Sequence, residues 1–344
     1  MEPKISVVLP VHNCEKYVAD AVESALSQTY PAWEIIAVDD GSTDDTHKIL
    51  ESFAGKITIR TIKRSGSPAV PRNVGIQWST GNYIAFLDAQ DVWFKDKLRK
   101  QAEIVQRYPE AGFVCGDFVT READRRLRRH FTEQAFPHEL DRRLICFNKP
   151  MEAAFKLLLE MDFVGCASTV LLSKRVIDRI GGLNPMYPCA EDYEYWFRCA
   201  RYTRFLILSD ILAYRRRPEV LAASDDIGML ENHKRVLLEV FSDHREYLRE
   251  QRLLDDCFAQ LALINRNQAV YYSGIGEKKQ ALKLCLQSLL FSCSPDNLGF
   301  WFRASMRMLS HRLSGLRRRS GMDITPRNRV FDESGTDGRL NAKL

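Results

Sequence analysis

Acidic side chains follow short apolar runs in the first ninety residues of the chain. The runs are 5–9, 35–38 and 83–87, and the residues that follow them include His12, Asn13, Asp39, Asp40, Asp88 and Asp91. Ligands of open α/β sheets bind at the carboxyl ends of the strands, so these run ends predict one crevice lined with carboxylates. Carboxylates gathered in this way are suited to hold a divalent metal ion together with phosphate groups.

A second acidic pair, Glu191-Asp192, stands at the start of a predicted helix, after a Gly181-Gly182 break. A carboxylate there can remove the proton of a hydroxyl group, and a like charge beside it can raise its pKa toward neutral pH. Acids at a helix start also stabilise the helix dipole, so the pair on its own is more typical of a helix cap. Its chemical role depends on the motifs that precede it.

Alternating strands and helices must position these residues. Strands are predicted over 5–9, 35–39, 57–61 and 83–87, and helices over 17–28, over 72–78 and after Ser42 and Asp45, which have the spacing of a capping box. This alternation predicts a parallel sheet wrapped in helices. Further on we expect a helix over 96–107, strands over 112–120, 163–173 and 203–214, a loop or insertion over 121–143, a helix over 174–180 and helices from 227 to 313.

The composition bounds the class of protein. The chain has 344 residues, 45% of them hydrophobic, which is enough for one large domain and an accessory one. Its nine cysteines stand singly, which predicts reduced thiols in a cytosol and disfavours a zinc cage or a disulfide framework. Neither a signal peptide nor a membrane-spanning run is recognisable, so we expect the catalytic part to be soluble.

In their order and spacing, the motifs resemble those of the family 2 glycosyltransferases, which are inverting enzymes with the GT-A fold. The matching strings are Pro10-Val11-His12-Asn13 with Tyr17, Ser27-Gln28-Thr29-Tyr30, Trp33-Glu34-Ile35-Ile36, residues 39–44, Arg72-Asn73-Val74-Gly75, residues 81–88, Gly181-Gly182 and Glu191-Asp192. The resemblance covers about residues 3–220 and implies an α/β fold with a Rossmann-like mixed sheet and an all-helical C-terminal extension. We expect a GT-A domain over 1–222, a helical domain over 223–319 and a disordered tail over 320–344.

The resemblance also implies a role for each matching residue. It makes Asp192 the base, with Glu191 either orienting it or contacting the acceptor, and it makes Asp91, with Asp88 second, the ligand of Mn²⁺ or Mg²⁺. The implied contacts to the nucleotide sugar are Pro10, Val11, His12, Asn13, Asp40, Arg72, Asp88, Gln90 and Arg217. Two of these stay open, because Arg72 can instead pair with Asp39 or Asp88, and His12 can be an exposed turn residue instead of stacking on the base.

Two departures from the family pattern bear on the chemistry. Gln90 stands where most relatives have an aspartate, and Arg217 stands where many have a histidine. A fixed arginine can stabilise a leaving diphosphate without a metal ligand, so we expect a site that depends less on metal and leave the strength of metal binding open. The departures motivate one alternative, a catalytically inactive nucleotide-binding or scaffold module of the same fold.

The C-terminal region carries two further patterns. Ala269, Tyr272, Gly276, Ala281, Leu289 and Pro295 resemble one tetratricopeptide-like helical hairpin. The residues Leu298, Trp301, Phe302, Leu309, Leu313 and Leu316 share a helix face that six arginines between residues 297 and 322 flank, with no acid among them. Such a basic helix either lies on an anionic membrane surface or packs within the helical domain, and both readings stay open.

Together these patterns predict an inverting glycosyltransferase of the hexosyl or N-acetylhexosaminyl type. We expect it to move a sugar from a nucleotide-diphosphate sugar, UDP-linked, to a hydroxyl of a cell-envelope glycan or lipid-linked acceptor. A sugar-phosphate nucleotidyltransferase is disfavoured, because the segment after the first strand lacks the Gly-rich basic loop that this chemistry needs. We expect a cytoplasmic protein that does not bind nucleic acid, and leave peripheral contact with the cell membrane and a homodimer open.

Overall fold

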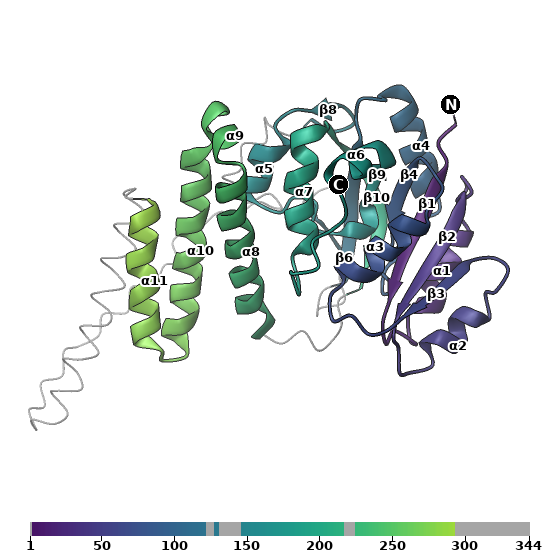
Figure 1. Cartoon of the computed structure of the whole chain (residues 1–344), viewed down its shortest axis with the longest axis horizontal. Coiled ribbons are helices and arrows are strands. Elements are labelled where there is room, and N and C mark those ends of the chain that lie inside the picture. Colours follow the sequence, from purple (N-terminus) through teal and green to yellow (C-terminus); the bar gives the residue numbers. More distant parts are fainter. Residues whose placement is uncertain (1, 122–126, 131–145, 217–223, 293–344) are drawn as a thin grey trace, which may run out of the picture. The chain divides into compact units, whose positions relative to one another are not determined.

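A mixed sheet with helices on both faces forms the centre of the fold (Figure 1). The computed structural model describes residues 2–121, 127–130, 146–216 and 224–292. The first half of the sheet is parallel, in the order β3 (Thr58–Ile62), β2 (Glu34–Asp40), β1 (Ile5–Val11) and β4 (Tyr83–Phe86). The sequence predicted this parallel half correctly.

The second half of the sheet changes direction. It continues from β4 through β9 (Leu171–Ser173), β6 (Phe113–Arg121), β10 (Phe205–Arg215) and β5 (Val92–Trp93), while β7 (Leu127–Arg129) pairs with β6 and β8 (Pro150–Met151) with β10. Strand β9 is antiparallel to both neighbours, and β10 is parallel to β6 but antiparallel to β5. The sheet is therefore the mixed, Rossmann-like type that we expected.

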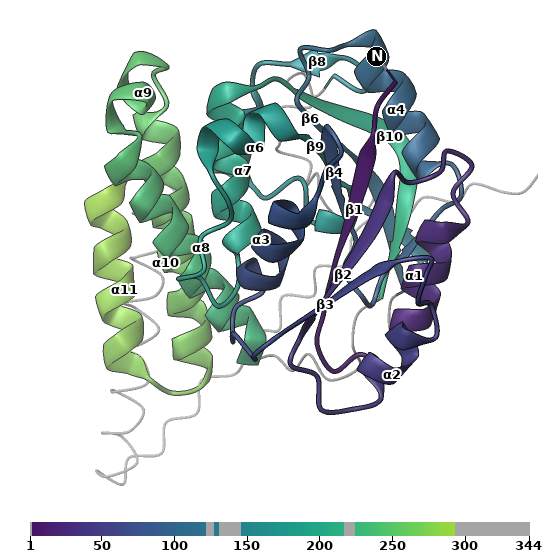
Figure 2. The ribbon, with the colours of Figure 1, turned by 45° about the vertical axis from the view of Figure 1, so that its right-hand side comes forward.

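Helices cover both faces because successive side chains of a buried strand point to opposite sides. On β1, Val7 and Leu9 pack with α1 (Val18–Leu26), α2 (Thr46–Glu51) and α4 (Lys97–Arg107), whereas Val8 packs with helices of the other face. Those are α3 (Ala69–Trp78), α5 (Ala154–Glu160), α6 (Lys174–Ile180) and α7 (Glu191–Tyr202). Figure 2 shows α3 and α1 on opposite sides of β1.

A glycine sets the closeness of α3 to the sheet. A Cβ atom at Gly75 would lie 2.4 Å from Cγ1 of Val8, so a larger residue would push α3 off β1. Arg72 and Asn73 precede this contact on the same helix, and the Asn73 amide exchanges two 2.8 Å hydrogen bonds with the backbone of Leu183. The Arg-Asn-Val-Gly motif therefore ties the sheet, α3 and the segment before α7 together.

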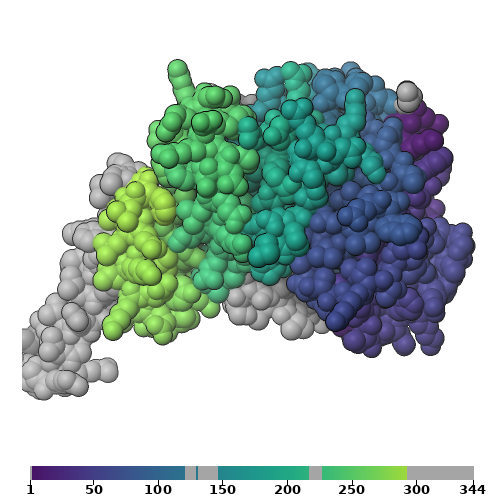
Figure 3. Space-filling model, viewed as in Figure 1, coloured from purple at the N-terminus to yellow at the C-terminus, as the bar shows by residue number. Residues whose placement is uncertain are grey.

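Four further helices follow β10. They are α8 (Ser224–Asp243), α9 (Arg245–Glu250), α10 (Leu254–Gly274) and α11 (Lys278–Phe291), as predicted for a helical C-terminal extension. Helix α10 packs on α11 as a hairpin, with Ala269 and Ala281 buried, and α8 packs on α7. In Figure 3 the side chains of α8 and α10 meet those of the segment around α7 without a break in the surface. The domain limits 1–222 and 223–319 stay predictions.

Several local predictions were wrong. The helix expected after Ser42 and Asp45 begins at Thr46, and neither side chain caps it, because the Ser42 hydroxyl instead accepts the Asn13 N–H. The expected strand 163–173 is a strand only over Leu171–Ser173, since the buried segment before it turns through a short 3-10 helix at Ala167–Thr169. The expected loop 121–143 contains β7, and α3 begins at Ala69, before Arg72.

Some predictions lie outside the described residues. They concern Arg217, Pro295, the basic helix over 298–316 and the tail over 320–344. Among the helices that the structure describes, none combines the length and the apolar character needed to cross a membrane.

Candidate functional site

The predicted site residues follow neighbouring strands at one edge of the sheet. Strand β1 lies between β2 and β4, and Val11 at its end is paired with Asp39 near the end of β2. Asp40 ends β2, and Asp88 follows the end of β4. The segments that we expected to converge therefore do so, because parallel neighbours end at the same edge.

Arg72 joins two of the predicted acidic groups. Its guanidinium is buried, and it donates a 2.7 Å hydrogen bond from Nη2 to Oδ1 of Asp88 and another from Nη1 to Oε1 of Glu191. Burial opposes the charge of Arg72, but the carboxylates of Asp88, Glu191 and Asp192 outweigh burial and raise the pKa of Arg72. Arg72 thus gathers the acidic motif after β4 and the acidic pair of α7 at one place.

Asp39 makes a different set of contacts. It accepts the N–H of Ser42 at 3.0 Å and lies 3.0 Å from Nδ1 of His47. Of the two alternatives left open for an Arg72 ion pair, the structure therefore has the one with Asp88.

The acidic motif after β4 contains one buried and one open carboxylate. Asp91 is 3% exposed, and its oxygens accept hydrogen bonds from the Ser168 hydroxyl at 2.6 Å and from the Arg216 N–H at 3.2 Å. Burial raises the pKa of Asp91 to about 6, and the negative charge of Asp88 adds to this shift. The Asp88 side chain is 37% exposed, and Gln90 is half-buried beside it.

The donor set of this motif fits a divalent ion that is shared with phosphates. No three His, Cys, Asp or Glu side chains within the described ranges converge as a protein-only metal site. Mg²⁺ and similar ions in nucleotide sites take only one or two carboxylates from the protein, because phosphates and water supply the other ligands. Asp88 and Asp91 lie near enough for the charge of Asp88 to act on Asp91, so a cation between them would relieve their repulsion.

Asp40 is anchored to the loop after β3. It is 1% exposed, and its carboxylate accepts the Ser65 N–H at 2.7 Å, the Ser65 hydroxyl at 2.9 Å and a hydrogen bond from Arg64. Gly41 has a φ of 66°, and a Cβ there would lie 2.8 Å from the Arg64 backbone nitrogen, so this close approach requires glycine. The loop therefore packs against the end of β2.

The residues at the end of β1 border the turn after β2. The Asn13 amide oxygen accepts the Thr43 N–H at 2.8 Å, and Asn13 itself has a φ of 45°. Nδ1 of His12 is buried and has no hydrogen-bond partner among the described residues. Pro10 and Val11 belong to the strand itself. His12 is thus a half-buried side chain with an unused polar atom, and its contact with a base stays a prediction.

Asp192 lies in the first turn of α7, after Ala190 in a left-handed conformation with a φ of 63°. Its Oδ1 accepts the N–H of Tyr193 at 2.8 Å. Burial raises the pKa of the neighbouring Glu191, Arg72 opposes this shift, and the charge of Asp192 adds to it. The pair is therefore more than a helix cap, because Glu191 is held by Arg72 while Asp192 stays half-exposed.

Sequence reasoning missed several residues of this region. Ser65 and Arg64 hold Asp40, Ser168 holds Asp91, and Asp162 and Arg215 act electrostatically on Asp192. Only Arg215 had a signal in the sequence, because it belongs to the arginine run that ends at Arg217. It also donates a 2.7 Å hydrogen bond to the Gly165 carbonyl, which holds it at the site.

Comparison with known proteins identifies the family. Residues 6–166 match the sequence model described as Glycosyl transferase family 2. This part of the chain belongs to that family. The transferase domain is 41% identical to the putative teichuronic acid biosynthesis glycosyltransferase TuaG of Bacillus subtilis over 107 residues, which are 30% of this chain and 42% of TuaG. It is also 28% identical to WfgD of Escherichia coli over 196 residues, which are 56% of this chain and 68% of WfgD.

Solved structures share the GT-A fold of the transferase domain. TarS of S. aureus, residues 1–349 in complex with UDP, superposes with a TM-score of 0.52 at 18% identity over 81% of this chain and 89% of that chain. The mannosyltransferase PcManGT of Pyrobaculum calidifontis, in complex with GDP-Man and Mn²⁺, superposes with a TM-score of 0.54 at 16% identity over 89% of this chain and 85% of that chain. The predicted fold class is thereby confirmed.

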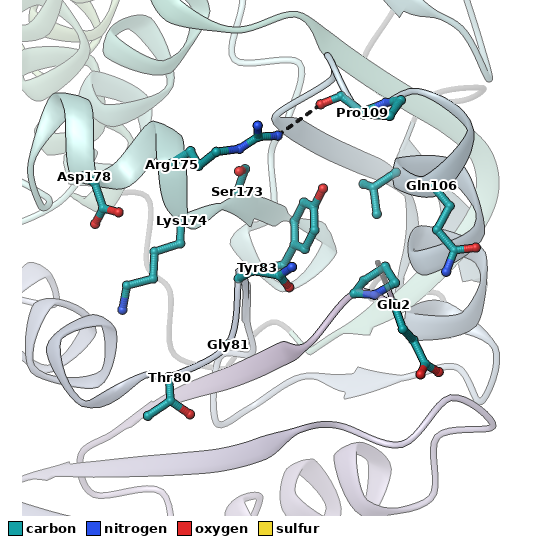
Figure 4. A pocket seen from close by; sticks show the side chains of 13 residues that line it. Glu2, Thr80, Gly81, Tyr83, Gln106, Pro109, Ser173, Lys174, Arg175 and Asp178 are labelled. Carbon is teal, nitrogen blue, oxygen red and sulfur yellow. Dashed lines mark hydrogen bonds between the residues drawn. The ribbon is translucent and has the colours of Figure 1, made fainter.

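A separate cavity of about 1130 Å³ lies at the other edge of the sheet (Figure 4). Its lining includes Tyr83 at the start of β4 and Lys174 and Arg175 at the start of α6. In Figure 4, Arg175 reaches toward the Pro109 carbonyl, at 3.5 Å. None of the predicted site residues that the structure describes lines this cavity, because those residues follow the opposite ends of the strands.

We expect Arg72→Met to lower the free energy of unfolding by about 3–5 kcal/mol, because it leaves the buried Glu191 and the carboxylate of Asp88 without their cation. Urea denaturation at neutral pH measures the loss. The matched control is Arg99→Met, whose ion pairs with Asp96 and Glu103 are exposed to solvent and screened by it, so we expect almost no loss. Equal losses in the two variants would contradict a central role for the Arg72 ion pairs.

The buried carboxyl group of Asp162 makes the free energy of unfolding depend on pH. Burial raises its pKa from 3.8 to about 7, and the negative charge of Asp192 adds to the shift. Because the folded protein then holds an extra proton between these values, the free energy of unfolding falls as pH rises from about 4 to about 7. We expect Asp162→Asn to flatten this fall, measured by urea denaturation across that range. The exposed Asp178→Asn serves as control, and an unchanged slope in Asp162→Asn would refute the assignment.

Proposed function

We propose that the protein transfers a sugar, with inversion, from a UDP-linked donor to a hydroxyl of a cell-envelope glycan or lipid-linked acceptor. The observation that carries the proposal is the pairing of Arg72 with both Asp88 and Glu191, because it brings a donor-side carboxylate next to a candidate base. The relatives support the substrate class. WfgD is named a UDP-Glc:alpha-D-GlcNAc-diphosphoundecaprenol beta-1,3-glucosyltransferase, and TarS has been solved with UDP-GlcNAc.

The donor side consists of the ends of β1 and β2. Asp40 accepts hydrogen bonds from the nucleoside in place of part of its present set from Arg64 and Ser65. Pro10, Val11, His12 and Asn13 border this position, and the unpartnered Nδ1 of His12 offers a further polar contact. This arrangement orients the nucleoside so that its diphosphate extends toward Asp88.

The diphosphate lies beside Asp88, Gln90 and Asp91. Asp88 and Asp91 would hold a divalent ion, which supplies positive charge to the diphosphate as it leaves. Gln90 contributes an amide that can bond a ribose or phosphate oxygen. Arg215, whose charge acts on Asp88 and Asp91, adds a fixed cation on the same side.

Asp192 removes the acceptor proton. The acceptor oxygen attacks the anomeric carbon, the bond from that carbon to the diphosphate breaks, and its electron pair leaves with the nucleoside diphosphate. The hydroxyl proton passes to the Asp192 carboxylate. Glu191, held by Arg72, fixes the first turn of α7 so that Asp192 faces the reacting centre.

We expect Asp40→Asn to weaken UDP binding about tenfold to hundredfold, because one charged hydrogen-bond acceptor is lost. Isothermal titration calorimetry measures the dissociation constant. Asp45→Asn is the control, since Asp45 is an exposed aspartate close by in the chain, at the start of α2. Equal affinity in wild type and Asp40→Asn would place the nucleoside elsewhere.

A panel of nucleotide sugars, followed by release of nucleoside diphosphate, tests the activity itself. We expect turnover with a UDP-linked donor and a loss of about 10²–10⁴ in kcat for Asp192→Asn, with UDP affinity unchanged. Glu194→Gln is the control, because Glu194 lies in the same helical turn but pairs with Arg198. UDP binding without turnover of any donor would favour the inactive module suggested by Gln90.

A further inference from the structure

Helix α8 forms hydrogen bonds with the segment that leads into the acidic pair of α7. The Asn232 amide donates to the Cys189 sulfur at 3.1 Å, and Arg235 donates to the Met186 carbonyl at 3.3 Å. One turn further on, Glu239 accepts the hydroxyl hydrogen bond of Tyr187. These contacts fix the position of α8 relative to the start of α7.

His233 of α8 packs against Tyr193, the residue that follows the candidate base. Its ring packs against that of Tyr193, with centroids 4.8 Å apart and a 44° tilt. Tyr193 is itself fixed, because its hydroxyl donates a 2.6 Å hydrogen bond to the Leu158 carbonyl. Since Tyr193 directly follows Asp192, this contact holds the imidazole beside the first turn of α7.

The ring nitrogens of His233 are available for a hydrogen bond. Among the described residues, neither ring nitrogen is engaged in a hydrogen bond, although the side chain is largely enclosed. Burial lowers the pKa of His233, and the charge of Asp192 opposes that shift. The imidazole is therefore neutral at pH 7 and can donate one N–H.

We propose that His233, supplied by the C-terminal helices, is a positioning residue that orients the Asp192 carboxylate toward the acceptor hydroxyl. The proposal deepens the proposed transfer reaction and rests on it. A neutral imidazole that donates to Asp192 favours the ionised carboxylate, which is the form that a base requires. It also gives the helical region a direct part in the reaction.

Other charges also act on Asp192. Arg72 from α3 and Arg215 from the end of β10 attract its carboxylate, while Glu191 and Asp162 repel it. From α7, the charged group that acts on His233 is Asp192. A change in the pH profile on removing His233 therefore reports on this pair.

The first test measures the contact without any reaction. The ring protons of His233 are titrated by NMR in wild type and in Asp192→Asn, with the signal assigned by its loss in His233→Gln. We expect the pKa of His233 to fall in Asp192→Asn, because the favourable charge is lost. His244, whose pKa is governed by burial and by the charges of Arg201, Asp243 and Arg198, serves as the internal control. An unchanged His233 titration overturns the proposal, even if the protein transfers no sugar.

The second test uses the reaction. His233→Phe keeps a ring against Tyr193 but has no donor, whereas His233→Gln keeps a donor. We expect kcat to fall about tenfold in His233→Phe, with the acid limb of kcat/KM shifted to higher pH and the KM for the donor unchanged. His233→Gln retains most activity and the wild-type profile, as does His244→Gln. A wild-type profile in His233→Phe contradicts the positioning role, whereas absence of turnover in wild type contradicts the proposed function.

Discussion

A buried guanidinium must be neutralised by its neighbours, and this requirement organises the edge of the sheet that carries the proposed site. Arg72 satisfies it with Asp88 from the end of β4 and Glu191 from the start of α7. Removal of either partner would leave an uncompensated charge, so the two segments are held at one position. The two acidic segments, to which we assign the donor side and the acceptor side of the proposed site, therefore share one electrostatic support, although about 100 residues separate them in the chain.

The same edge carries more negative charge than its arginines neutralise. Asp88, Asp91, Asp162, Glu191 and Asp192 all act on Arg72 or Arg215. Burial and mutual repulsion raise the pKa of Asp91 to about 6 and that of Asp162 to about 7. A surplus of carboxylates of this kind favours a bound cation at this edge, which is what the proposed transfer from a diphosphate donor would use.

The helices after β10 are also connected to this edge of the sheet by hydrogen bonds and packing. Ser65 holds Asp40, Ser67 donates a 3.3 Å hydrogen bond to the Tyr187 carbonyl, and Tyr187 bonds Glu239 of α8. The segment before α7 thus lies between the loop that holds Asp40 and helix α8. Because α8 shares the core of α7, with Val236, Leu237 and Val240 buried in the same cluster, the helical extension also supports the site.

The strands, and the acidic residues that follow them, could be predicted because both depend on local sequence signals. Buried parallel strands are continuous apolar runs, and their carboxyl ends converge by topology alone. The partners of these residues could not be predicted in the same way. Ser65, Asp162 and His233 reach the site only through tertiary packing, and nothing in their own sequence neighbourhood sets them apart. Arg72 was an intermediate case, because its pairing with Asp88 was foreseen as one alternative, whereas its contact with Glu191 was not.

The most direct test is a crystal structure of the protein soaked with UDP and Mn²⁺, with the metal located by its anomalous scattering. The account predicts the uracil next to Asp40, the metal ion at Asp88 and Asp91, and the diphosphate between Asp88 and the first turn of α7. A nucleotide bound in the cavity beside Tyr83, or a metal remote from Asp88, would contradict it.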